Sequence, residues 1–161
     1  MQTSYSENQN PVGYPGQLAD SGFTDKVSVI CAAAIPFGKF VVKDTADGSG
    51  KLPGEATDIT NAKLAQGVAL ATQAIEQNPS VPTPQYPAKS VVSCLRKGRA
   101  WVQVEEAVDP TDDVFVRYAA GGSGVGSFRA SAGTSEAAIL ANAKYKTSAD
   151  AEGFALVEFN L

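Results

Sequence analysis

The residue types that most enzymes use for proton transfer and metal binding are thinly represented in this chain. Its 161 residues contain no histidine, which removes Ser-His and Cys-His catalytic pairs and imidazole-based zinc sites. No serine stands three residues before a lysine, and no G-x-S-x-G sequence is present, so common serine-nucleophile motifs are missing as well. Catalysis would therefore have to use carboxylates and backbone groups.

The carboxylate groups of the sequence each have a simpler explanation than catalysis or metal binding. Glu105 and Glu106 are adjacent, and because neighbours in a strand point to opposite faces, they are not expected to share a substrate. Asp44 and Glu55 have the outer spacing of a calcium loop, but the residues between them do not fit its ligand positions. A further group fits a solvated Asp-Pro turn: Asp109, Asp112 and Asp113. We predict no catalytic residue, no metal site and no enzymatic activity.

The glycine-rich stretch Gly121–Gly126 (GGSGVG) is the remaining candidate for a binding motif. A phosphate-binding loop needs a helix behind it, and a P-loop also needs a lysine, whereas SFRASAG follows here. The stretch is therefore predicted as a flexible hairpin, and we expect no cofactor.

Composition limits the partners and the compartment. The net charge is −4 at pH 7, which argues against a nucleic-acid partner because phosphate binding needs clustered Lys and Arg. The longest unbroken apolar run, Val29–Ile35, is far shorter than a membrane span. The N-terminal sequence lacks a signal-peptide pattern, and Cys31 and Cys94 lie in apolar segments typical of buried, reduced thiols. We expect synthesis and assembly in a cytoplasm, with no membrane partner.

Short apolar segments separated by turn-forming residues indicate an all-β domain. The predicted strands are Lys26–Ala34, Phe37–Lys43, Leu64–Thr72, Ser90–Leu95, Arg99–Glu105, Val114–Tyr118 and Phe154–Leu161. Ser135–Ala141 is expected as one short helix, and Asp44–Thr60 is expected as a polar loop. The segment Asn78–Ala88 contains four prolines and is predicted as a stiff, polyproline-like excursion. The fold class is thus a small β-barrel or sandwich-like domain with long loops and an extended N-terminal arm.

The arm comprises residues 1–25 and precedes a single β domain over residues 26–161. Between Asn10 and Val27 it combines prolines and glycines, which interrupt helices and strands, with apolar residues such as Tyr14, Leu18 and Phe23. Such a segment cannot satisfy its own backbone groups and needs another surface. Two interpretations stay open: an adhesive arm that reaches another chain, or a cover over its own domain.

Aromatic residues also occur on predicted polar faces of strands. Alternation in Arg99–Glu105 directs alanine and valine toward the core and places Trp101, the single tryptophan, on the other face. In Val114–Tyr118, Phe115 lies beside Arg117 on the face away from the core. Either a loop of the same chain covers these rings, or they form a subunit interface, where Trp, Phe and Arg are enriched.

Several stretches occur in order along most of the chain: YSENQNPVGYPGQLADSG, IPFGKFVV, AQGVALAT, KGRAWVQVEEAV leading to FVRYAA, and AKYKTSADAEGFALVEFNL. Together they resemble the phage structural cement proteins, which decorate the heads of tailed bacteriophages. The resemblance implies a small β-barrel-like domain that forms trimers on the outside of the capsid and clamps neighbouring capsomers at three-fold and quasi-three-fold positions. The segments Asp44–Thr60 and Asn78–Ala88 match no shared pattern.

With this resemblance, the expected partners are the major capsid protein of a phage head and further copies of the chain in a homotrimer. The expected location is the outer surface of the virion, after synthesis in the host bacterial cytoplasm. The predicted capsid-contact residues are Pro11, Tyr14, Pro15, Leu18 and Phe23, and the predicted subunit-interface residues are Trp101, Phe115 and Arg117. A stand-alone ligand-binding β-barrel and a carboxylate-dependent hydrolase are the alternative functions.

Overall fold

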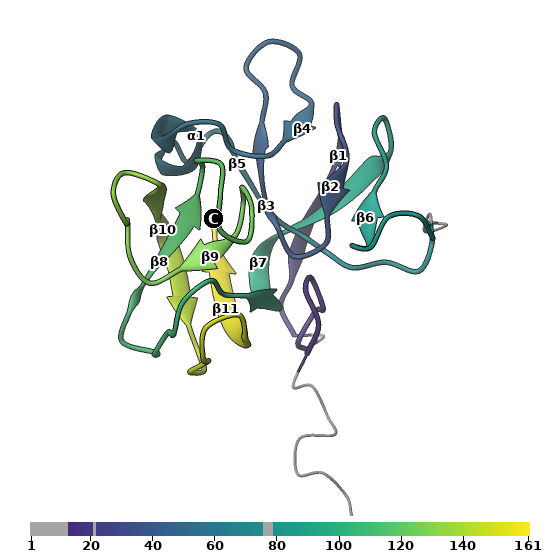
Figure 1. Cartoon of the computed structure of the whole chain (residues 1–161). Coiled ribbons are helices and arrows are strands. Elements are labelled where there is room, and N and C mark those ends of the chain that lie inside the picture. Colours follow the sequence, from purple (N-terminus) through teal and green to yellow (C-terminus); the bar gives the residue numbers. More distant parts are fainter. Residues whose placement is uncertain (1–12, 21, 76–78) are drawn as a thin grey trace, which may run out of the picture.

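The computed structural model describes residues 13–20, 22–75 and 79–161, and their regular structure is almost entirely β-strand (Figure 1). The elements in chain order are β1 (Asp25–Ile30), β2 (Ile35–Pro36), β3 (Phe40–Lys43), β4 (Gly50–Lys51), α1 (Ala56–Thr60), β5 (Ala65–Ala69), β6 (Gln85–Tyr86), β7 (Val91–Gln103), β8 (Asp113–Arg117), β9 (Phe128–Arg129), β10 (Ala137–Tyr145) and β11 (Phe154–Asn160). The predicted all-β class with one short helix is confirmed.

One antiparallel sheet organises the domain. Its strand order is β4-β3-β5-β7-β11-β10-β8-β9, with β1 paired to β7, and β2 and β6 form a separate two-stranded ribbon. The sheet curls on itself (Figure 1). Its two ends come together beside Phe40, whose N–H donates to the Gly126 carbonyl at 3.0 Å. The Phe40 ring also packs edge-on against the Phe128 ring, with 6.5 Å between the ring centroids. The result is a barrel-like curl around one core.

Two hydrophobic cores lie on opposite faces of β3, β5 and the first half of β7. The main core is enclosed by the curled sheet and contains Phe40, Val68 and Leu95 from these strands. The second core contains their neighbours Val41, Ala69 and Cys94 and lies on the other face. Strand residues alternate in direction, so these short strands are buried on both faces and read as continuous apolar runs.

The proline-rich segment, whose role the sequence left undecided, contributes to the cover of the second core. Tyr86 of β6 is 1% exposed, and its hydroxyl donates to the Leu70 carbonyl at 2.6 Å. Its ring packs edge-on against Phe37, with 5.1 Å between ring centroids. The segment thus closes the face of the sheet that the barrel-like curl leaves open.

Three sequence predictions about elements are corrected. Residues Ser135–Ala141 are not helical: β10 begins at Ala137, and Ala138 lies opposite Val116 of β8, because pairing and burial override the helix propensity of alanine. The short helix is instead α1, within the predicted loop, where Ile59 is buried in the main core. The strands predicted on either side of Gly98 are one strand, β7, in which Gly98 has φ 127°.

We predict that Gly67→Ala destabilises the fold strongly. Gly67 has φ +118°, and a Cβ there would lie 2.1 Å from the Leu95 carbonyl oxygen. Backbone strain and overpacking together are expected to lower the free energy of unfolding by about 2–4 kcal/mol, measured by urea denaturation. The control is Gly54→Ala, whose Cβ would meet only Asp58 at 3.8 Å and should change stability by less than about 0.5 kcal/mol. Equal unfolding midpoints for the two variants would contradict the close contact.

Candidate interaction surfaces

Residues 13–20, here called the strap, run along an edge of β7 (purple in Figure 1). The Gly16 N–H donates to the Trp101 carbonyl at 2.9 Å, the Trp101 N–H donates to the Gln17 carbonyl at 2.9 Å, and the Ala19 N–H donates to the Arg99 carbonyl at 3.0 Å. Strand β1 pairs with the earlier part of the same edge. The strap and β1 therefore pair with β7 along most of one edge.

Two glycines let the strap lie against the domain. Gly16 has φ +77°, and a Cβ there would lie 2.6 Å from the Ala69 carbonyl oxygen. Gly13 is buried, and a Cβ there would lie 2.3 Å from Cγ of Trp101, so its backbone rests on the indole ring. The half-buried Trp101 is thus covered in part by its own chain, through the backbone of the arm.

The predicted capsid-contact residues separate into two groups. Leu18 packs against the main core, and Pro15 is half-buried against Gly38. Tyr14 and Phe23 are 53% and 85% exposed. Pro11 lies outside the described residues. The arm therefore has residues that attach it to its own domain and two aromatic rings that stay open to a partner, and capsid contact at these positions stays a prediction.

The predicted subunit-interface residues lie in different surroundings. Phe115 of β8 is half-buried and lies opposite Ile139 of β10, which is 45% exposed. The Arg117 side chain is 7% exposed and finds its ionic partners within the chain. Subunit contact at Trp101, Phe115 and Arg117 stays a prediction.

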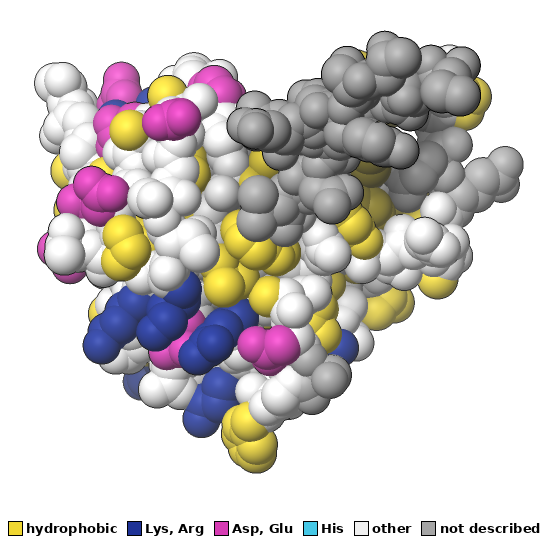
Figure 2. Space-filling view, turned by 90° about the horizontal axis from the view of Figure 1, so that it is seen from below, with side chains coloured by type: hydrophobic (Ala, Val, Ile, Leu, Met, Phe, Trp, Pro, Cys, Tyr) yellow, Lys and Arg dark blue, Asp and Glu magenta, His cyan; other side chains and the backbone are white. Residues whose placement is uncertain are grey.

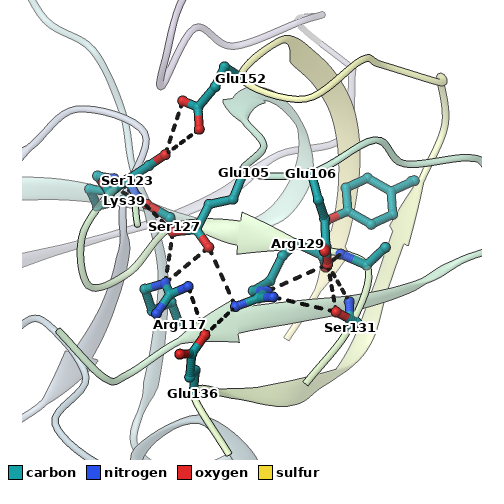
Figure 3. Close-up of polar contacts among 12 residues, drawn as sticks. Lys39, Glu105, Glu106, Arg117, Ser123, Ser127, Arg129, Ser131, Glu136 and Glu152 are labelled. Atoms are coloured by element: carbon teal, nitrogen blue, oxygen red, sulfur yellow. Dashed lines mark hydrogen bonds and ion pairs between the residues drawn. The ribbon is translucent and has the colours of Figure 1, made fainter. Parts of the chain in front are cut away.

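A partly buried ion cluster joins two arginines, one from β8 and one from β9, to three carboxylates (Figure 3). The Arg117 Nε donates to both oxygens of Glu105, at 2.8 and 3.0 Å. Glu136 accepts from Arg117 at 3.1 Å and from Arg129 at 3.0 Å. Glu106 accepts from Arg129 at 3.5 Å and from the backbone N–H groups of Ala130 and Ser131 at 2.9 and 2.8 Å. The cluster fastens the loop before β10 to the end of β7.

One carboxylate of the cluster, Glu105, and the Lys39 ammonium also hold the glycine-rich segment in place. Glu105 accepts the Ser123 N–H at 3.0 Å, and the Lys39 ammonium donates to the Ser123 carbonyl at 2.6 Å and to the Ser127 hydroxyl. Burial lowers the pKa of Lys39, against the opposing effect of the Glu105 and Glu152 charges. The segment connects the paired strands β8 and β9, so the predicted hairpin is present, and hydrogen bonds to Glu105 and Lys39 hold its turn.

The arginines change the acidity of the cluster. The hydrogen bond from Arg129 and the charge of Arg117 lower the pKa of Glu136. Burial alone would raise the pKa of Glu106, but the Ser131 hydroxyl and the Arg129 charge outweigh it and lower that pKa. Hydrogen bonds from the Arg117 guanidinium to Glu105 raise the pKa of Arg117. All these groups are therefore held in their charged forms near neutral pH.

The expectation that Glu105 and Glu106 point apart is wrong. Strand β7 ends at Gln103, so strand alternation no longer applies, and Arg129 lies 3.6 Å from Glu105 and 3.5 Å from Glu106. Both carboxylates are occupied by arginines and backbone N–H groups. Sequence reasoning missed this cluster, and its one signal was the position of Arg117 on the face of β8 opposite the core valines.

One of the hollows on the described surface is only large enough for a water molecule or two. It measures about 40 Å³ and is lined by Ile59, Leu140 and Leu161 among others, well below the several hundred Å³ of typical ligand pockets. A larger open hollow of about 580 Å³ lies beside Phe23, Lys97 and Arg99. The described part of the chain contains no helix with the length and hydropathy needed to cross a membrane.

Comparison with known proteins defines the class. The model of the structural cement protein family (E217 gp24/Pam3 gp6) matches residues 1–160, so the chain belongs to the phage structural cement protein family. A solved structure described as the capsid of Myoviridae Phage XM1 shares the fold, with a TM-score of 0.74 at 19% sequence identity, over 95% of this chain and 93% of the other. No curated protein matches the chain. The predicted family is confirmed, and it is a family of structural proteins.

We predict that Gly16→Ala detaches the strap while the domain stays folded. The added Cβ would meet backbone atoms of Ala69, Ala71 and Gly38 within 2.9 Å. Because Trp101 is the single tryptophan, its fluorescence should shift to longer wavelength as its cover is lost, with circular dichroism unchanged. Gly22→Ala, in an exposed position next to Asp20, is the matched control. Unchanged emission in Gly16→Ala would show that the strap tolerates the substitution.

We also predict that the ion cluster makes stability depend on pH below about 4.5, the ordinary carboxyl value. A carboxyl whose pKa is lower in the folded state stabilises the fold above its unfolded pKa, and this stabilisation is lost as the pH falls through the folded value. Glu136→Gln should therefore lower the melting temperature at pH 7, and the difference from wild type should shrink in acid.

Thermal melting from neutral to acidic pH measures this difference. The control is Glu55→Gln, at an exposed position where the side chain makes no capping hydrogen bond, and its difference from wild type should be small at every pH. A Glu136→Gln difference that stays constant down to the lowest pH would contradict the role of the cluster.

Proposed function

We propose that this protein attaches to the outer surface of a phage head as a homotrimer and stabilises the contacts between neighbouring capsomers. The observation that carries the proposal is the family match over residues 1–160, because it covers the arm as well as the domain. The partner would be the major capsid protein, and the site of action the outside of the virion.

The strap gives this proposal a physical basis. Its backbone hydrogen bonds to Arg99 and Trp101 fix where the arm leaves the domain, so little conformational freedom near that point is lost on binding. Tyr14 of the strap and Phe23, which follows the strap in sequence, are exposed, and aromatic rings bury large areas at interfaces. We propose that these two rings contact the shell, while Pro15 and Leu18 act by anchoring the arm.

Trimer formation would raise the overall affinity for the head even if the contact made by each subunit is weak. A single contact of about 5 kcal/mol corresponds to a dissociation constant near 0.2 mM. In a rigid trimer the second and third contacts become intramolecular, and effective concentrations near millimolar raise the overall affinity about ten- to a hundredfold. We propose that Trp101 and Phe115 lie at or near the subunit interface and that Arg117 holds the loops beside it in place.

The test combines the native mass of the free protein with co-sedimentation on undecorated phage heads. We expect a trimer, and we expect the double variant Tyr14→Ser/Phe23→Ser to keep its mass and melting temperature but to bind heads at least about tenfold more weakly, since each interface aromatic contributes on the order of 1 kcal/mol or more.

Val91→Ser is the control, because Val91 is 55% exposed and lies at the far end of β7 from the strap. A monomer at micromolar concentration would contradict the trimer. Failure of the wild-type protein to sediment with heads would contradict the attachment, and equal binding of the double variant and the control would contradict the role of the two rings.

A further inference from the structure

The outer face of three neighbouring strands carries most of its charge as cations. Arg99 of β7 lies opposite Glu158 of β11, which in turn lies opposite Lys144 of β10. Lys97 precedes Arg99 by two residues in β7, and Lys146 follows Lys144 by two residues, directly after the end of β10. We call these four cations, Lys97, Arg99, Lys144 and Lys146, the basic face. Figure 2 shows Lys and Arg side chains gathered on one part of the surface, with acidic side chains among and beside them.

One carboxylate occupies the middle of the basic face. Glu158 accepts a hydrogen bond from Arg99 at 2.8 Å and lies 3.9 Å from the Lys146 ammonium. The Arg99 hydrogen bond, followed by the charges of Lys146, Arg99 and Lys144, lowers the pKa of Glu158. The surroundings of this side chain therefore favour negative charge. Asp20 of the strap, 3.9 Å from Arg99, and Asp113, opposite Lys144, lie at the borders of the face.

Two of the four cations have no carboxylate within ion-pair distance among the described residues. These are Lys97 and Lys144. The Lys97 ammonium lies over the Phe23 ring, 5.8 Å from its centroid, and Phe23 is itself 85% exposed. The open hollow of about 580 Å³ is lined by Phe23, Lys97 and Arg99, and also by Asp20 and Glu158. The face thus offers unpaired positive charge next to an exposed aromatic ring and a recess.

We propose that the basic face binds a carboxylate-rich surface of the shell protein, with Lys97 and Lys144 pairing with its acidic side chains. The inference rests on the proposed attachment to a phage head and names a second contact beside the arm. The net charge of the whole chain is −4 at pH 7. An acidic partner surface is therefore repelled by most of the molecule but attracted by the basic face. Charge complementarity of this kind fixes orientation and speeds encounter. The face would therefore decide which side of the domain meets the shell.

The decisive variant is Lys97→Glu/Lys144→Glu. Neither lysine belongs to an ion pair within the described chain, so the fold should persist. The matched control is Lys43→Glu/Lys63→Glu, which changes the net charge equally at exposed positions near the β3–β4 turn. Lys97→Gln/Lys144→Gln is a milder second variant, which removes the two charges without adding repulsion.

Each protein is tested by co-sedimentation with undecorated heads at about 0.1 M and about 1 M salt, where the screening length falls from about 10 Å to about 3 Å. Native mass is measured in parallel. We expect the Glu variant to bind at least about tenfold more weakly than the control at low salt, the Gln variant to bind at an intermediate level, and both to lose much of the wild-type salt dependence. The mass should not change.

Three other results overturn the inference in distinguishable ways. If wild-type protein does not sediment with heads, the proposed function itself fails. If wild type sediments and the basic-face variants bind as the control does, the acidic partner surface is wrong while the attachment stands. If the basic-face variants alone lose the oligomer, the face is a contact between copies of this chain and not a contact with the shell.

Discussion

Backbone hydrogen bonds along both edges of β7 hold together parts of the chain that are far apart in sequence. One edge is paired by β1 and then by the strap, and the other edge is paired by β5 and then by β11. An unpaired edge strand is a template for unwanted association, so this long strand needs partners on both sides. The N-terminal arm supplies the last of them, which ties its first described residues to the centre of the sheet.

A second constraint is that β7 contributes side chains to both hydrophobic cores, one on each of its faces. The first half of β7 sends Cys94 to the second core and Leu95 to the main core, so strands on both faces depend on its register. A one-residue shift would exchange these faces. The two-stranded ribbon of β2 and β6 then closes the second core, which explains why a stiff, proline-rich excursion returns to the domain at Tyr86.

The ion cluster holds loops against the outer side of the barrel-like sheet, whereas the two hydrophobic cores hold the strands together inside. Arg117 and Arg129 lie on strands, whereas their carboxylate partners lie on the connections that follow β7 and precede β10. Buried charges are costly unless they are paired and hydrogen-bonded, and here each carboxylate has several donors. The glycine-rich turn between β8 and β9 is thereby fastened to the end of β7 through Glu105. A protein that binds a large assembly benefits from this rigidity because less ordering is required on contact.

The sequence by itself determined the all-β class, most strand positions, the family and the unusual character of the arm, because alternation, turn residues and apolar content are local properties. It did not determine that β10 is a strand, since the helix propensity of its alanines is local while its pairing with Val116 is not. Nor did it place Gly16 against Ala69, bring Glu105 and Glu106 to one arginine, or align Arg99, Glu158 and Lys144 across three strands. Those arrangements depend on register between segments distant in the chain, and only tertiary packing sets that register.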